Sequence, residues 1–205
     1  SAHGGNSGLE FFADMRELQA SHGQGLAADL VIVATTSSVR FNLASEAIER
    51  FHPARIVFEK FLFPRRSEYA LMQQMLDARQ IEAWVHCSRN EAPGYHAIRA
   101  LVAKRAGPVH MTVTGGRFAL ASNAIHFLAL YNHLTGVRAI SADSSGLKEA
   151  DAGNRREGYC ELTGDLLVRY SDGGTLTITD HGTEALPVTI SITAPDIAVT
   201  VDERG

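Results

Sequence analysis

The sequence has only two cysteines, no block of like charges and no long apolar run. Cys87 and Cys160 each lack a Cys-x-x-Cys partner, which excludes a disulfide framework. No apolar run approaches the ~20 residues that a membrane span needs, and the polar start SAHGGNSG is unlike a signal peptide. The net charge of -4 argues against a nucleic-acid or anionic-membrane surface. We therefore expect a cytoplasmic protein with no nucleic-acid or membrane partner and no metal site.

The composition is that of an ordinary globular protein. Hydrophobic residues make up 45% and charged residues 20% of the 205 residues, which suffices for one large or two small domains. From residue 9 to residue 104, three short apolar strands alternate with three amphipathic helices. The strands are predicted at 29–37, 55–61 and 81–88, and the helices at 39–51, 65–80 and 95–107. This alternation predicts a parallel, doubly wound α/β sheet.

The pattern changes after Pro108. Residues 110–116 are predicted to form a strand and 122–136 a helix, with Ser122 as the N-cap. A polar loop follows, and from about residue 158 the alternation of apolar and polar residues predicts an antiparallel meander. The chain is thus expected to have an α/β part followed by an α+β part, with the boundary near residue 107.

The meander is expected to form an open sheet that buries one face against helices. We assign Val168, Leu176 and Ile178, mixed with threonines, to the other face. Open sheet faces that carry apolar side chains often pair with a second copy of the chain. The sequence therefore predicts a homo-oligomer formed through the open sheet.

Polar clusters follow each of the three predicted parallel strands. They are Thr35–Ser38, the pair Glu59-Lys60, and Ser88–Asn90. The carboxyl ends of parallel strands meet at one edge, where α/β sheets bind ligands. Lys60 could donate to a substrate oxygen with Glu59 orienting it, or the pair could simply cap a strand in a salt bridge. Both interpretations remain open at this point.

Four segments in order carry a family resemblance. They are DLVIVATTSSVRFNLASEAIE, ARIVFEKFLFPRRSEYALMQQML, SRNEAPGYHAIRALV and ASNAIHFLALYNHLTG. They resemble the strand end Ala-Thr-Pro, the Glu-Lys-Pro motif, the Arg-x-x-x-Pro segment and the histidine-bearing helix of the glucose–fructose oxidoreductase and inositol dehydrogenase family. The resemblance implies a partial Rossmann-like dinucleotide-binding domain at 1–107. It also implies an α+β substrate and oligomerisation domain with an open, mainly antiparallel sheet at 108–205.

The resemblance also implies an activity, which is hydride transfer between NAD or NADP and a carbinol carbon of a sugar, polyol or nucleotide-sugar-like substrate. Lys60 would match the motif lysine that contacts the reacting hydroxyl and the cofactor. His126 would match the histidine that takes or gives the hydroxyl proton, a task that suits an imidazole. Without the other motifs, His126 would be interpreted as a histidine on an amphipathic helix with no catalytic role.

Further site residues follow from the same resemblance. Cofactor contacts are expected from Thr35, Thr36, Ser37, Glu59 and Arg89, in addition to Lys60. Arg89 could instead hold an anionic substrate group. Arg117 and Asn123, which precede His126, are the expected substrate contacts.

The sequence departs from the family pattern in several respects, such as Thr36 and Phe61 where the family motifs have proline, and one departure is the most serious. It has no Gly-x-Gly-x-x-Gly turn between a strand and a helix, the element that brings backbone N–H groups to the pyrophosphate. We therefore expect the 205-residue chain alone to bind the cofactor weakly or not at all. The chain is either part of a longer oxidoreductase or a non-catalytic relative that binds a sugar-like ligand or a protein partner. An unrelated α/β enzyme that uses Glu59, Lys60 and Arg89 on an anionic substrate is a third interpretation.

Overall fold

The computed structural model describes residues 8–23, 25–150, 160–182 and 184–203. The chain divides into two compact units, Ser1–His86 and Cys87–Gly205. Across the described ranges, none of the helices is both long and apolar enough to cross a membrane.

The first unit is a small parallel α/β sheet, as the alternating pattern predicted. Its strands lie in the order β1-β2-β3, and all pairs are parallel. The elements are α1 (Met15–His22), β1 (Leu30–Val33), α2 (Ser37–Phe51), β2 (Arg55–Phe58), α3 (Arg66–Arg79) and β3 (Glu82–Val85). One face of the sheet is buried, because Val33, Ile56 and Phe58 pack in one core with Ile48 of α2 and Leu76 of α3.

The opposite face of this sheet carries a row of apolar side chains. Ile32, Val57 and Trp84 are register partners across the three strands. Ile32 is 65% and Trp84 50% exposed. Side chains alternate between faces along a strand, so this row points away from the core that Val33 and Phe58 join. Within the described residues, α2 and α3 thus cover one face of this sheet, whereas doubly wound sheets are usually covered on both.

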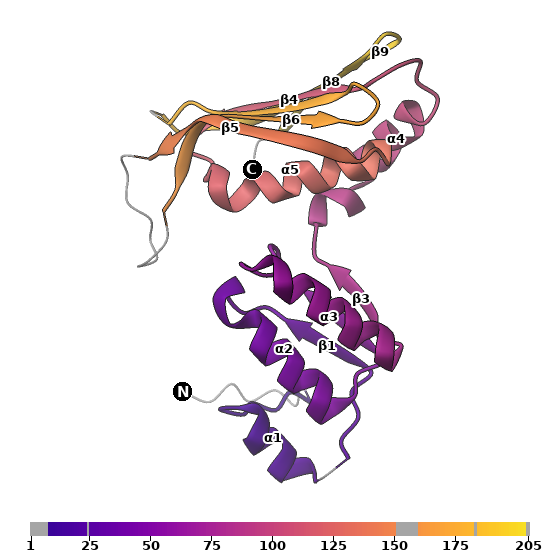
Figure 1. Ribbon diagram of the computed structural model, residues 1–205, viewed down its shortest axis with the longest axis vertical. Coiled ribbons are helices and arrows are strands. Elements are labelled where there is room, and N and C mark those ends of the chain that lie inside the picture. Colours follow the sequence, from indigo (N-terminus) through magenta and orange to yellow (C-terminus); the bar gives the residue numbers. More distant parts are fainter. Residues whose placement is uncertain (1–7, 24, 151–159, 183, 204–205) are drawn as a thin grey trace. The chain divides into compact units, whose positions relative to one another are not determined.

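The second unit is a six-stranded, mainly antiparallel sheet with helices on one face, as Figure 1 shows for α4 and α5. The strand order is β5-β6-β7-β4-β8-β9, and among the strands that the structure describes here β4 and β7 pair in parallel while the other neighbours are antiparallel. The helical elements are η1 (Ser88–Glu91, a short 3-10 helix), α4 (Pro93–Val102) and α5 (Leu120–Thr135). The strands are β4 (His110–Gly116), β5 (Ala139–Glu149), β6 (Leu162–Tyr170), β7 (Thr175–Asp180), β8 (Leu186–Ala194) and β9 (Ile197–Glu203).

The division between the units differs from the boundary expected near residue 107. It falls between His86 and Cys87, before α4. The physical reason is packing, since Tyr95, Ile98 and Val102 of α4 belong to the same buried core as α5 and the six-stranded sheet. The helix before this point, α4, ends at Val102, earlier than the predicted stop at Gly107-Pro108, and these two residues do not separate two cores.

The faces of the six-stranded sheet also differ from the sequence-based assignment. Val168, Leu176 and Ile178 are 3%, 0% and 0% exposed and belong to the core beneath the helices, so their assignment to the open face is wrong. The alternate positions carry hydroxyl side chains in register, with Thr112 paired to Thr177 on one side and Ser191 on the other. The open face is therefore rich in threonine, and a homo-oligomer through it stays a prediction.

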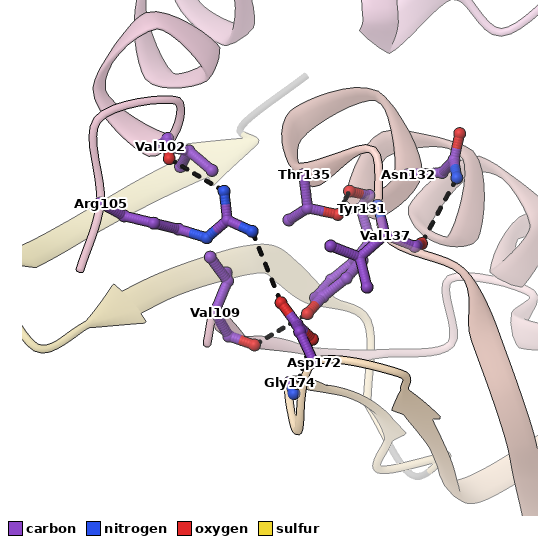
Figure 2. Close-up of polar contacts among 9 residues, drawn as sticks. All are labelled: Val102, Arg105, Val109, Tyr131, Asn132, Thr135, Val137, Asp172 and Gly174. Carbon is purple, nitrogen blue, oxygen red and sulfur yellow. Dashed lines mark hydrogen bonds and ion pairs between the residues drawn. The ribbon is translucent and has the colours of Figure 1, made fainter. Parts of the chain in front are cut away.

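A polar cluster joins α4, α5 and the turn between β6 and β7 (Figure 2). Arg105, just after α4, donates to the Asp172 carboxylate (3.4 Å), which in turn accepts from the Gly174 amide (2.9 Å). Tyr131 of α5 donates its hydroxyl to the Val109 carbonyl (2.9 Å). The Val109 carbonyl satisfies the buried Tyr131 hydroxyl, and the Arg105–Asp172 pair joins the end of α4 to the turn, so we assign the cluster to folding and not to chemistry.

Candidate functional site

The polar residues that follow β1 and β2 lie side by side at one edge of the first sheet. The Glu59 amide donates to the Val33 carbonyl (3.1 Å), so the loops after the two strands start in register. The His86 amide donates to the Phe58 carbonyl (2.8 Å) and continues the same alignment to β3. Thr35–Ser37 and Glu59-Lys60 therefore meet at the carboxyl edge, where parallel sheets bind ligands.

The loop after β1 leaves hydrogen-bonding capacity at this edge. Thr36 is the N-cap of α2 without a side-chain capping bond, and its hydroxyl lies 3.2 Å from that of Ser38. The Thr35 hydroxyl is buried and has no hydrogen-bond partner within the described residues. Because buried polar atoms are nearly always bonded, such an atom marks a position where a ligand could supply the missing partner.

Glu59 makes a local contact that the sequence did not predict. Its carboxylate accepts a hydrogen bond from the backbone amide of Lys60 (2.8 Å). Both residues are half-buried. The carboxylate thereby helps to fix the main chain at Lys60, whichever role the amine has.

Arg40 is a residue of this edge that the sequence analysis missed. It is 2% exposed, and its guanidinium donates to the carbonyls of Thr35, Phe61 and Leu62. The signal was present, because Arg40 stands on the stripe of α2 that also buries Ala44, Ile48 and Phe51. A cation at a core position of an amphipathic helix requires partners for its N–H groups.

In the second unit, Arg89 forms a two-pronged ion pair with Glu203. The Arg89 Nε lies 2.8 Å from Glu203 Oε1, and Nη2 lies 2.6 Å from Oε2. Tyr95 of α4 donates its hydroxyl to the same carboxylate (2.7 Å). The guanidinium also stacks 4.6 Å above the ring of Phe127, the residue after His126. The end of β9 is thus joined to η1, α4 and α5 at a point next to His126.

The electrostatics of this group keep both partners charged. Burial of Glu203 favours its neutral form, but the hydrogen bonds from Arg89 and Tyr95 outweigh burial and lower its pKa, with His126 contributing in the same direction. The hydrogen bond to Glu203 raises the pKa of Arg89, although burial opposes this. Burial, followed by the contact with Glu203, raises the pKa of Tyr95 and keeps its phenol protonated.

The loop between β4 and α5 is held by one buried carboxylate. Asp180 is 2% exposed and accepts from the amides of Arg117 (2.8 Å), Phe118 (3.1 Å) and Gly182 (2.9 Å). Arg117 itself adopts a positive φ of 53°, which is unusual for a residue other than glycine. Strained backbone of this kind persists where the surroundings impose it and is frequent at functional sites.

The start of α5 differs from the predicted one. The N-cap is Ala119, not Ser122, because Glu161 supplies the capping carboxylate from a distant strand end. It accepts from the Ala121 amide (2.6 Å), and the Ser122 hydroxyl donates to it (3.3 Å). Asn123 donates its side-chain amide to the Phe118 carbonyl (2.6 Å), so it secures the loop.

The predicted site residues are thus divided between the two units. The first unit holds Thr35, Thr36, Ser37, Glu59 and Lys60 around one sheet edge. The second unit holds the remainder, namely Arg89, Arg117, Asn123 and His126. His126 follows Asn123 by one turn of α5, and it is half-buried. The convergence of Lys60 and His126 on one pocket stays a prediction.

Solved structures share this fold, whereas no protein-family model and no curated protein matches the sequence. GenD2 from gentamicin A biosynthesis, solved with NAD, matches with a TM-score of 0.69 and 17% identity over 95% of this chain and 59% of its own. The WlbA dehydrogenase of Bordetella pertussis, solved with NADH and UDP-GlcNAcA, matches with a TM-score of 0.71 and 19% identity over 95% and 63%. The UDP-N-acetylglucosamine 3-dehydrogenase GnnA of Acidithiobacillus ferrooxidans matches with a TM-score of 0.67 and 16% identity over 85% and 55%.

These likenesses define the class of fold. The three-stranded parallel sheet and the six-stranded mixed sheet have the fold of the matching parts of these solved structures. The chain spans less than two thirds of the length of each of the three.

Proposed function

We propose that the chain is part of an NAD(P)-dependent oxidoreductase of the glucose–fructose oxidoreductase and inositol dehydrogenase family. The reaction would be hydride transfer at a carbinol carbon of a sugar, polyol or nucleotide-sugar-like substrate. The observation that carries the proposal is the fold likeness over 95% of the chain to GenD2 and WlbA, which were solved with NAD and NADH. The order of the four sequence segments supports the same family.

The residues at the first sheet edge fit one side of a nicotinamide cofactor. The buried Thr35 hydroxyl lacks a partner among the described residues, and the hydroxyls of Thr36 and Ser37 lie beside it at the start of α2. These groups, with Glu59 and Lys60, would bind the polar edge of the cofactor. A bound nicotinamide would supply the hydride acceptor or donor. The pyrophosphate would be held by residues outside this sequence, which has no Gly-x-Gly-x-x-Gly turn.

The open edge of β1 is where that other part would pair. The Val33 carbonyl points toward β2, so the backbone groups of Ile32, one residue earlier, point the opposite way. Among the described residues, β1 pairs with β2 alone. An apolar groove of about 410 Å³ runs along this edge, lined by side chains that include Leu18, Leu43 and Phe51. An open apolar edge of this kind favours pairing with another strand.

The chemistry would be divided between Lys60 and His126. The Lys60 amine would donate to the reacting hydroxyl, and the His126 imidazole would take or return its proton. One small substrate can touch both groups at hydrogen-bond range only if they lie within about 10 Å of each other. A structure of the complete protein in which Lys60 points away from His126 would end this assignment.

The other predicted contact residues differ in how much of each side chain is available to a ligand. The Arg117 side chain is exposed at the loop before α5, so it is accessible to a substrate. The Asn123 amide already holds the Phe118 carbonyl, so Asn123 would contact a substrate through its oxygen. Arg89 would reach the cofactor or an anionic substrate group only with the part of its guanidinium that Glu203 leaves available.

The test is an activity assay of the full-length gene product. NADH or NADPH formation, followed by absorbance, would be measured with a panel of sugars, polyols and UDP-sugars. Lys60→Ala and His126→Asn should each lower turnover by a factor on the order of a hundred or more without unfolding the protein. Lys148→Ala, at an exposed position of β5, is the matched control and should leave turnover unchanged. Binding of a sugar ligand without any turnover would favour the non-catalytic alternative.

A further inference from the structure

We propose that Arg40 is a positioning residue for Lys60. Its buried guanidinium joins the loop after β2 to the loop after β1, and so determines where the Lys60 amine lies. The inference rests on the proposed role of Lys60 in hydride transfer, but it concerns a residue that neither the motifs nor the fold likeness assigns.

The contacts of Arg40 connect two separate loops. One prong, Nη1, donates to the carbonyls of Phe61 and Leu62, the latter at 3.1 Å, and the other, Nη2, donates to the carbonyl of Thr35. Arg40 stands in the first turns of α2, which begins at Ser37 directly after the β1 loop. A single side chain therefore fixes the loop of the predicted cofactor contacts to the loop of the predicted lysine.

The guanidinium geometry is what makes this possible. Arg40 is 2% exposed, and a buried cation is stable only when its N–H groups are bonded. The planar fork of arginine presents its donors in fixed directions, so it can hold carbonyls on two sides at once. Lysine has the same charge but presents it as a compact point, and it cannot reproduce both contacts.

Loss of the Arg40 contacts would displace Lys60, because Lys60 lies between the two anchored ends of the loop. Phe58 and Phe63 are each 3% exposed and hold the two ends of the loop in the core. Glu59 and Lys60 lie between them, and the carbonyls that Arg40 binds belong to the next two residues. Without Arg40, the main chain at Phe61 and Leu62 would lose its hydrogen bonds to α2, and the apolar contact between Phe63 and Phe41 of α2 would remain. A displacement of about 1 Å in a reacting group can lower the rate roughly a hundred-fold.

The catalytic test compares Arg40→Met with Arg50→Met in the full-length gene product. Arg50 stands on the same helix and pairs with Glu46, so its replacement removes the same charge away from the loops. For Arg40→Met we expect kcat to fall about a hundred-fold, with the substrate KM changed by less than about three-fold, and partial recovery when guanidinium ion is added at millimolar concentration. In Arg40→Lys we also expect kcat to fall, without recovery on addition of guanidinium ion. This variant is assayed in place of Arg40→Met if Arg40→Met does not fold. An unchanged kcat in Arg40→Met would overturn the proposal.

A second readout separates this inference from the proposed function. Amide hydrogen exchange of the full-length protein should show at least ten-fold faster exchange at Glu59 and Lys60 in Arg40→Met, and unchanged exchange in Arg50→Met. Equal exchange in both variants would show that Arg40 does not hold the loop. If the unaltered protein transfers no hydride with any substrate, the proposed function fails, and Arg40 loses its role toward Lys60 even where exchange increases.

Discussion

Glu203→Gln should destabilise the second unit by removing one charge from a partly buried ion pair. The unaltered carboxylate accepts from Arg89 at 2.8 and 2.6 Å and from Tyr95 at 2.7 Å. Glutamine keeps the shape of the side chain and one oxygen, but it turns an NH2 group toward a donor. The variant therefore loses the charge and at least one of these hydrogen bonds, with the backbone of β9 otherwise unchanged.

The magnitude follows from the burial of the pair. The side chains of Arg89 and Glu203 are 23% and 22% exposed, so solvent screens their attraction only in part. Hydrogen bonds to charged groups contribute about 1.5–3 kcal/mol each, and a buried cation left without its partner adds a cost. We expect the free energy of unfolding at pH 7 to fall by about 2–3 kcal/mol. Glu91→Gln, at an exposed carboxylate of η1, should change it by less than about 0.5 kcal/mol.

The stability difference between the unaltered protein and Glu203→Gln should also depend on pH in a definite direction. The pKa of Glu203 is lowered from its ordinary value of 4.5, because the contacts with Arg89 and Tyr95 outweigh burial. A lowered pKa means that the unfolded chain binds the proton more tightly, so the stabilisation is complete above pH 4.5 and is lost as the pH falls through the folded pKa. The difference between the unaltered protein and Glu203→Gln should therefore shrink below pH 4.5.

The assay is urea unfolding followed by circular dichroism, repeated between pH 7 and the acid limit of folding. Two results would refute the reasoning. One is a loss of stability in Glu203→Gln that equals the loss in Glu91→Gln. The other is a difference from the unaltered protein that stays constant as the pH falls.

Three further predictions use other parts of the chain. Gly174→Ala would place a Cβ 2.2 Å from the Tyr131 hydroxyl, so the free energy of unfolding in urea should fall by about 2–3 kcal/mol. Gly173→Ala has open space around the new Cβ but keeps a φ of 88°, so its free energy of unfolding should fall by about 1–2 kcal/mol. Asp180→Asn should lose about 2–3 kcal/mol and speed amide exchange at Arg117, because an amide group cannot accept from all three donors; unchanged exchange would contradict this. The 205-residue chain alone should bind NAD(H) or NADP(H) weakly or not at all by calorimetry, and a micromolar affinity would contradict that expectation.

The elements could be predicted because their signals are local. The apolar runs at 29–37, 55–61 and 81–88 each contain a parallel strand, and the helix C-terminal end at Gly136 follows from its freedom to adopt a φ of 69°. The capping of α5 could not be predicted, because Glu161 accepts from the Ala121 amide 40 positions away. Long-range polar contacts leave no periodic mark on the sequence.

The candidate site shows the same division between local and distant information. Its position at the strand ends followed from the pattern of apolar strands and polar loops. The partners of its charged groups did not, since Arg89 and Glu203 are 114 positions apart. Arg40 is an intermediate case, because its place on the buried stripe of α2 was readable while the carbonyls that it binds were not.

The open sheet shows why alternation alone cannot assign a face. In Thr175–Asp180 the odd positions are threonines and the even positions include Leu176 and Ile178, so the two faces are distinct, but nothing local says which one the helices cover. The apolar surface of α5 decides, because burying Leu176 and Ile178 beneath it removes the most apolar area from water. The hydroxyl face is what remains. A partner that binds there would have to form hydrogen bonds to threonine side chains such as Thr112 and Thr177 and could bury little apolar area, so such an interface would depend on shape and hydrogen bonding more than on the hydrophobic effect.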